Sequence, residues 1–157
     1  MKSNYLETIQ AIERLHRQFL EVIKAELDRQ GIEDVNNVQS LILSHIGEDE
    51  LTVGELTYRG YYQGSNVSYN VKKLVENDYL LQERSAHDRR NIKVRVSSKG
   101  KAICDLVEGL YDRHAAALPN TGIPEDGLSD VNATLKRLER FWAHELAYGP
   151  AQGIPAA

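Results

Sequence analysis

The sequence has few of the features that mark secreted or membrane-embedded proteins. Its 157 residues include a single cysteine, Cys104, so no disulfide can form within the chain. No apolar run approaches the ~20 residues that a helix needs to cross a bilayer. The first residues lead directly into a charged segment, without the apolar core of a signal peptide. We therefore expect a cytoplasmic protein that has no contact with a membrane.

Motifs for catalysis and for metal binding are also missing. The sequence contains no glycine-rich phosphate loop and no nucleophile motif. The five histidines, at positions 16, 45, 87, 114 and 144, lack the short spacings of metal ligands. The sequence thus predicts neither an enzyme nor a protein that carries a metal or another cofactor.

Charge is distributed unevenly along the chain. The net charge is −4 at pH 7, which at first sight is unfavourable for binding a nucleic acid. Between positions 52 and 101, however, 10 Lys and Arg accompany 5 Asp and Glu, a balance of +5, whereas the rest of the chain carries 9 and 18, a balance of −9. A basic stretch in an otherwise acidic chain is typical of a localised nucleic-acid-binding surface.

The basic stretch contains a helix with one apolar and one polar face. Val67, Val71 and Leu74 are four and three positions apart, which predicts that they share the buried face of a helix over residues 65–77. The opposite face carries polar residues: Ser65, Asn66, Ser68, Tyr69, Lys72, Lys73 and Glu76. Of these, Ser, Asn, Tyr and Lys are types that hydrogen-bond to base edges and phosphates. Taken alone, this pattern also fits the solvated face of an ordinary helix.

A charged hairpin follows this helix. Leu80–Arg84 and residues 92–97 have the composition of strands, and in the second run Ile92, Val94 and Val96 alternate with polar residues. The loop between them contains His87, Asp88, Arg89 and Arg90. An extended arginine fits the narrow, electronegative minor groove of DNA, and Asp88 is suited to hold it extended. The alternative is a solvated surface hairpin with a local ion pair.

Two helices are predicted before the polar-faced helix, and a short third one leads into it. Residues 5 to about 30 carry a broad apolar stripe with spacings of four and three, which suits dimerisation or packing within one subunit. Asn36 or Asn37 caps a second helix, which ends at Gly47. Thr52 and Glu55 have the spacing of a capping box and open a short helix to about residue 58.

Two further helices are predicted after the hairpin. The first runs from Ser98 to about Leu118, and the proline-bearing segment 119–124 ends it. Ser129 or Asp130 caps the last helix, which ends near Tyr148 with an apolar stripe along one side. Residues 149–157 are rich in helix breakers and read as a flexible tail.

Three local sequence patterns resemble the MarR family of bacterial transcription regulators. They are LTVGEL at positions 51–56, VSYNVKKLVENDYL at positions 67–80, and the Asp88-Arg89-Arg90 loop followed by VRVSSKG at positions 94–100. The resemblance covers roughly residues 5–147. The sequence departs from the family at positions 57–63 and by the tyrosine at position 69.

The resemblance implies a mainly α-helical fold with a small β-hairpin wing. Residues 34–97 would form the winged helix-turn-helix DNA-binding domain, and residues 1–33 and 98–148 a helical region for homodimerisation. A two-fold dimer implies double-stranded DNA with a pseudo-palindromic operator, whose half-sites lie roughly 10 base pairs apart.

The predicted DNA-binding residues have distinct roles. Four face the major groove, two contact phosphate or bases at its edge, and the wing residues contact the minor groove and the backbone. In that order they are Ser65, Asn66, Ser68 and Tyr69, then Lys72 and Lys73, then Arg90 positioned by Asp88, with Arg89 and His87. The family also implies a small phenolic or lipophilic effector near His16, Phe19, Leu20, Ile42 and Leu56, although all five residues also suit a core.

Two alternatives to a ligand-responsive regulator stay open at this point. Cys104 suits a thiol redox sensor if its surroundings are electropositive and partly exposed, and it suits a core if they are not. A winged helix can also serve as a protein-binding adaptor that does not touch DNA. Binding that weakens steeply with salt would indicate nucleic acid as the partner.

Overall fold

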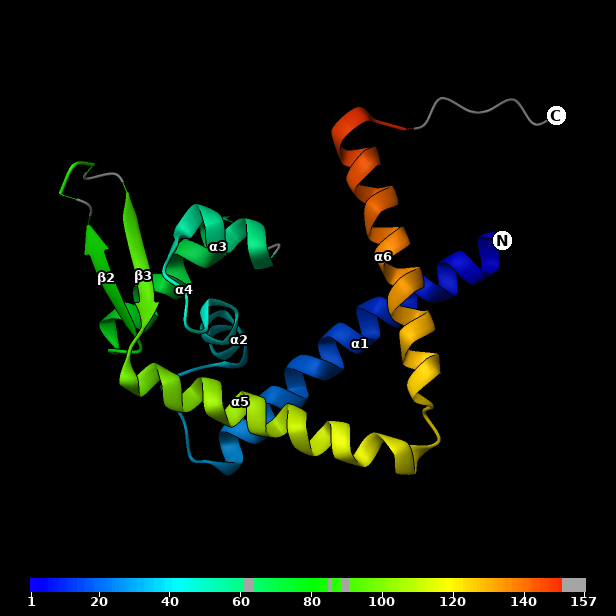
Figure 1. The fold of residues 1–157 in the computed structure, drawn as a ribbon, viewed down its shortest axis with the longest axis horizontal. Helices are drawn as coiled ribbons and strands as arrows, with labels where there is room; N and C mark the ends of the chain where they lie inside the picture. Colours follow the sequence, from blue (N-terminus) through cyan, green and yellow to red (C-terminus); the bar gives the residue numbers. More distant parts are fainter. Residues whose placement is uncertain (61–63, 85, 89–90, 151–157) are drawn as a thin grey trace. The chain divides into compact units, whose positions relative to one another are not determined.

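The computed structural model of the chain describes residues 1–60, 64–84, 86–88 and 91–150. Its elements are α1 (Lys2–Arg29), α2 (Asn37–Ile46), β1 (Leu51–Thr52), α3 (Val53–Gly60), α4 (Gly64–Glu76), β2 (Leu80–Arg84), β3 (Ile92–Val96), α5 (Ser98–Ala117), the 3₁₀ helix η1 (Leu118–Thr121) and α6 (Glu125–Tyr148) (Figure 1). The chain forms two compact units, residues 1–111 and residues 112–157. Within the described residues, no helix is long and apolar enough to cross a membrane.

Side-chain caps fix where the first helices begin. Asn36 caps α2: its side chain accepts the Gln39 N–H, and the Gln39 side chain accepts the Asn36 N–H. Thr52 and Glu55 make the same reciprocal pair at the start of α3, with N···O distances of 3.1 Å for both bonds. Each pair satisfies two N–H groups that the helix itself leaves without a partner. Both caps agree with the sequence prediction.

The sheet is one strand larger than the sequence predicted. β2 and β3 form the expected antiparallel hairpin, with Leu80 opposite Val96 and Arg84 opposite Ile92. The two-residue strand β1 adds to the other edge of β3, where Leu51 lies opposite Val94, so the strand order is β1-β3-β2. A run of two residues is too short to show a period of two, which is why the sequence did not predict this strand.

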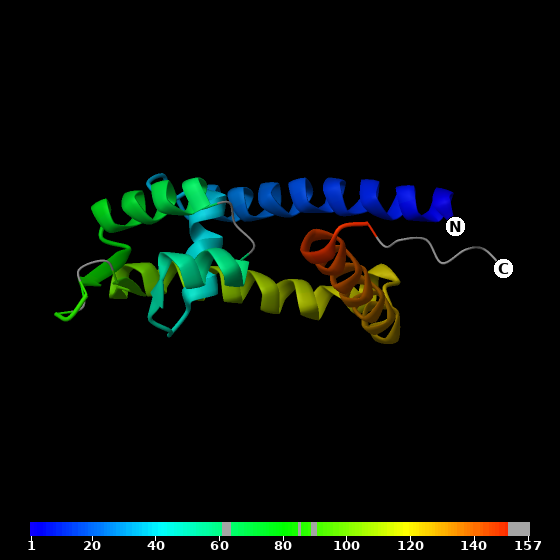
Figure 2. The ribbon, with the colours of Figure 1, turned by 90° about the horizontal axis from the view of Figure 1, so that it is seen from above.

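One apolar core holds together residues 34–97, which we call the winged unit. Val67, Val71 and Leu74 of α4 are all buried, as their spacing predicted, and they pack with residues of α2, α3 and the sheet. A second cluster joins the end of α1 to α2 and α5 through Ile23, Leu27, Leu41, Val107 and Leu110. α1 itself runs as one unbroken helix (Figure 2). The mainly α-helical fold with a β-hairpin wing is thereby confirmed.

The start of the last helix was predicted wrongly. α6 begins at Glu125, with Pro124 in the extended conformation before it, and not after a cap at Ser129 or Asp130. Glu125 and Asp126 lie in its first turn, where negative charge interacts favourably with the helix dipole. The helix therefore starts directly after the predicted break at residues 119–124, and Gly127 lies in its first turns. The predicted flexible tail, residues 149–157, lies outside the described residues from 151 onward.

We predict that Gly100→Ala destabilises the protein by about 1–3 kcal/mol, the usual cost of overpacking. An added Cβ at Gly100 would collide with the Tyr79 carbonyl and would lie 2.8 Å from Val96 Cγ1. Gly54→Ala in α3 is the matched control, because the nearest described atom to its Cβ would be Thr52 Oγ1, at 3.9 Å, and it should stabilise by about 0.5–1 kcal/mol. Urea unfolding of both variants measures these changes, and equal free energies would contradict the packing described for Gly100.

Candidate nucleic-acid interface

The polar face of α4 is exposed along the described part of the helix. Asn66, Ser68 and Lys72 are exposed, and 61% of the Tyr69 surface is accessible. The buried residues Val67, Val71 and Leu74 lie on the opposite side. Because the apolar face fixes the helix against the core, the polar face is presented outward as one rigid surface. The side chain of Ser65 lies outside the described residues.

Aromatic and charged groups follow one another along this face. The Lys73 ammonium lies 5.9 Å from the centre of the Tyr69 ring, one turn away, and 3.3 Å from the Glu76 carboxylate. A cation that is shared between a ring and an exposed carboxylate is held only weakly and can exchange to a phosphate. Tyr69 and Lys73 thus form a stripe suited to a groove edge.

The wing and α4 border a common hollow. A cavity of about 510 Å³ is lined by Ser68 of α4, by Asp88, Asn91 and Ile92 of the wing, and by residues 52–54 at the start of α3. The Asn91 N–H donates to the Asp88 carbonyl at 3.0 Å. Arg89 and Arg90, predicted to contact DNA, lie outside the described residues. The structure brings Ser68 and Asp88 together, and His87 is exposed nearby in sequence.

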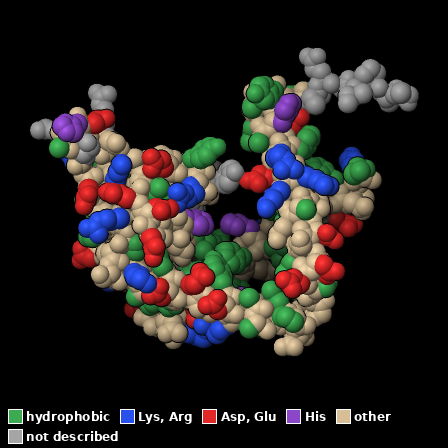
Figure 3. Space-filling model, viewed as in Figure 1, with side chains coloured by type: hydrophobic (Ala, Val, Ile, Leu, Met, Phe, Trp, Pro, Cys, Tyr) green, Lys and Arg blue, Asp and Glu red, His purple; other side chains and the backbone are tan. Residues whose placement is uncertain are grey.

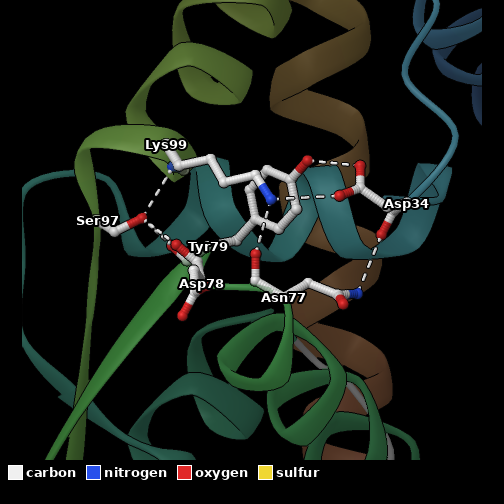
Figure 4. A network of polar contacts seen from close by, with 7 residues as sticks. Asp34, Asn77, Asp78, Tyr79, Ser97 and Lys99 are labelled. Carbon is white, nitrogen blue, oxygen red and sulfur yellow. Dashed lines mark hydrogen bonds and ion pairs between the residues drawn. The ribbon is translucent and has the colours of Figure 1, made fainter.

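A polar network fixes the far end of α4 (Figure 4). The Tyr79 hydroxyl donates to Asp34 Oδ1 at 2.6 Å, and Lys99 Nζ lies 3.3 Å from Asp34 Oδ2 and 2.9 Å from the Asn77 carbonyl. Lys99 also lies 4.2 Å from the centre of the Tyr79 ring. These contacts join the α1–α2 connection, the end of α4 and the start of α5.

The same network shapes the turn from α4 into β2. Asp78 has a left-handed backbone (φ 63°), which Asp tolerates better than most residues. The Ser97 hydroxyl donates to the Asp78 carbonyl at 2.6 Å and accepts the Gly100 N–H at 3.0 Å. The bond from Tyr79 lowers the pKa of the Asp34 carboxyl, and the Lys99 ammonium lowers it further. Burial and the Asp34 carboxylate raise the pKa of the Tyr79 hydroxyl.

The five residues predicted to bind an effector do not share one environment. Ile42 and Leu56 are fully buried in the core of the winged unit. Leu20 packs on the second apolar cluster, and the Phe19 ring stacks on Tyr111 with centroids 6.3 Å apart. His16 is exposed. Ile42 and Leu56 therefore serve packing in this conformation, and an effector site near these residues stays a prediction.

The surroundings of Cys104 disfavour a reactive thiol. The side chain is partly buried against the winged core, and burial, with Asp105 next to it, raises the pKa of the thiol. Lys101, the nearest cation in sequence, is paired with Asp105 at 2.8 Å. A raised pKa leaves less thiolate for oxidation, so the structure gives no support to the redox-sensor alternative.

Several residues at this surface were missed by the sequence analysis. Thr52 was predicted only as a cap, yet it lines the hollow between α4 and the wing with Val53, Gly54 and Asn91. The signal for the α3 residues was present in the capping box, which places backbone N–H groups at the start of a helix. The pairing that brings this helix start to the wing is long-range, between β1 and β3, and no local pattern reveals it.

Comparison with known proteins agrees with this geometry. Residues 33–91 match the sequence profile of the MarR family. The chain is 37% identical over 145 residues to the exopolysaccharide II synthesis transcriptional activator ExpG of Rhizobium meliloti (strain 1021), an alignment that covers 92% of this chain and 75% of the relative.

Solved structures share the fold at lower identity. Staphylococcus aureus MarR, in complex with salicylate and kanamycin, has a TM-score of 0.72 at 20% identity and covers 95% of each chain. Streptococcus pneumoniae FabT, in complex with DNA, has a TM-score of 0.72 at 17% identity and covers 88% of this chain and 97% of its own. Identities this low show the fold alone.

We predict that Asp34→Asn lowers the free energy of unfolding at pH 7 by up to about 1 kcal/mol, because the amide weakens the bonds to Tyr79 and Lys99. The folded-state pKa of Asp34 is lowered, so its stabilising effect is present above the ordinary carboxyl pKa of ~4 and is lost as the pH falls through the folded value. Urea unfolding between pH 7 and pH 3 should show the two proteins converging. A difference that stays constant with pH would contradict this assignment.

Proposed function

The chain belongs to the MarR family of transcription regulators, and from this premise we propose that it acts as a homodimer on pseudo-palindromic double-stranded DNA. The observation that carries the proposal is the exposed polar face of α4 beside the wing. In each protomer, Asn66, Ser68 and Tyr69 would read base edges, and Lys72 and Lys73 would contact phosphate or the groove edge. Such a protein works where the chromosome lies, in the bacterial cytoplasm.

The wing supplies the second set of contacts in this proposal. Arg90 would enter the minor groove, with Asp88 holding its side chain extended, while Arg89 and His87 would contact the backbone. The local excess of positive charge between positions 52 and 101 supports this arrangement. A protein with a net negative charge can approach DNA in this way, because its excess of positive charge is concentrated in one stretch of the chain.

Exposed apolar residues support the homodimer. All of α6 is described, and none of its residues is buried within the chain. Val131, Leu135 and Phe141 are 51%, 38% and 51% exposed, and hydrophobic side chains are visible on the surface along α6 (Figure 3). In α1, Leu15 is 62% exposed. Apolar helix faces of this length are normally covered by another chain, and a second copy presents the same faces in return.

Modulation by a small molecule is part of the proposal. The fold is shared with a S. aureus protein seen in complex with salicylate and kanamycin. A phenolic or lipophilic ligand would change the DNA affinity only if it binds one dimer conformation more tightly than another. The relative ExpG is a transcriptional activator. We therefore expect that DNA binding by this protein can activate transcription as well as repress it.

Selection from random duplex DNA tests the DNA-binding part of this proposal. We expect the retained fraction to contain an inverted repeat. Arg90→Ala should weaken binding to that repeat by about 1–3 kcal/mol, a loss comparable to a good base-edge contact. Lys72→Ala should also weaken binding, whereas Lys24→Ala, an exposed lysine paired with Asp28 on α1, should leave it unchanged. Retention without any shared sequence, equal in all variants, would contradict the proposal.

Sedimentation velocity of the free protein tests the dimer. Val131→Glu places a charge on the exposed apolar stripe of α6 and should convert the dimer to a monomer, because an unpaired buried charge costs several kcal/mol at an interface. Asn132→Glu is the matched control, because it adds the same charge at the next position of α6, which is occupied by an exposed polar residue. A monomeric wild type, or the same sedimentation coefficient for both variants, would argue against dimerisation through this face.

A further inference from the structure

An unbroken chain of side-chain amides connects α2 to α4. Gln39 is only 7% exposed. Its Oε1 accepts the Asn36 N–H at 3.1 Å, and its Nε2 donates to Asn70 Oδ1 at 3.2 Å. Asn70 Nδ2 in turn donates to the carbonyl of Asn66 at 2.8 Å. A buried amide on α2 is therefore bonded to the first turns of the helix that carries the DNA-reading face.

The segment between α1 and α2, which contains Asp34 and Asn36, also bonds to the other end of α4. Asp34 accepts the Tyr79 hydroxyl, just after α4 ends, and the Asp34 carbonyl accepts Asn77 Nδ2 at 3.4 Å. Two residues further on, the Asn36 N–H bonds to the Gln39 side chain, which in turn bonds to Asn70 in the first half of α4. The connection is itself fixed to α1, because Asn37 Nδ2 donates to the Leu20 carbonyl at 3.1 Å.

We propose that Gln39 and Asn70 are positioning residues that set the rotation and the axial position of α4 relative to α1, and thereby the half-site spacing that the dimer accepts. This inference rests on the proposed function. Neither residue needs to touch DNA. Asn70 faces α2 while its neighbour Tyr69 is exposed, so the direction of Asn70 dictates the direction of the reading face.

In this proposal the hydrogen bonds fix the orientation of α4, which the apolar core alone does not fix. Apolar contacts lose little energy when a helix slides or rotates slightly, because they depend on buried area and not on direction. A hydrogen bond weakens steeply when its angle or length departs from the optimum. Val67, Val71 and Leu74 therefore keep α4 on the core, whereas the amide chain at one end and the Asp34 contacts at the other select one orientation.

The experiment measures affinity for a panel of operators with different spacers. The inverted repeat selected by the wild-type protein is synthesised with its spacer shortened or lengthened by one or two base pairs, each of which moves a half-site by about 3.4 Å and about 35°. Binding of wild type, Asn70→Leu and Thr57→Val is compared. Asn70→Leu removes the hydrogen bonds that the Asn70 amide makes with Gln39 and Asn66, and it adds no charge. Thr57→Val is the matched control, because the bond of the Thr57 hydroxyl, to the Val53 carbonyl at 2.8 Å, stays within α3.

We expect wild type and Thr57→Val to prefer one spacer by roughly tenfold or more over its neighbours, as for a mismatched site. In Asn70→Leu this preference should fall to about threefold or less, with weaker binding to the best spacer. A uniform loss at all spacers, with the preference retained, would assign Asn70 to direct DNA contact and overturn the proposal. An unchanged profile would overturn it as well.

A second variant covers failure of the first to fold, which circular dichroism detects. Gln39→Met cuts the same link from α2, with a side chain of similar size, and should flatten the spacer profile in the same way. If both variants fold, the double variant should be no flatter than either single one, because both remove the bond between Gln39 Nε2 and Asn70 Oδ1, and the other bonds that they remove lie at the start of α2 and within α4. A wild-type protein that prefers no spacer would instead refute the proposed function itself, whatever the variants do.

Discussion

The exposed polar face of α4 depends on the burial of the opposite face of the same helix. α4 is 13 residues long, and an isolated helix of this length is marginal in water. Val67, Val71 and Leu74 remove that problem by packing into the core of the winged unit, where each is at most 5% exposed. Because these three residues supply the apolar contacts of α4, Asn66, Ser68, Tyr69 and Lys72 stay exposed on the opposite face. Burial of one face is thus the condition for exposure of the other.

Besides this apolar packing, α4 has directional polar contacts near both of its ends. Contacts at each end lead to residues 34–39: Gln39 bonds to Asn70, and Asp34 bonds to Tyr79 and Asn77. This short segment also bonds to the backbone of α1 through Asn37. A dimer that holds two reading helices at a fixed separation needs such a connection between its dimerisation helix and its reading helix. A ligand that shifts α1 would act on DNA affinity through the same contacts.

The sequence predicted the helices and the wing hairpin because their signals are local. The spacing of Val67, Val71 and Leu74 gave the buried face of α4, and the pairs Asn36–Gln39 and Thr52–Glu55 gave two helix starts. What it did not predict depends on contacts between distant residues. β1 forms only because Leu51 meets Val94, and Gln39 faces Asn70 across 31 positions. Local patterns also misplaced the start of α6, because Ser129 and Asp130 are residue types that often cap helices whereas the helix begins after Pro124 without a side-chain cap.

The central claim is that two copies of this chain bind one DNA duplex through the basic winged unit. Its most direct test is sedimentation velocity of the protein titrated into a duplex that carries the selected repeat, at several salt concentrations. The account predicts two protomers per duplex and an affinity that falls linearly on a log–log plot against salt, with the slope of several phosphate contacts. One protomer per duplex, or an affinity that does not respond to salt, would contradict it.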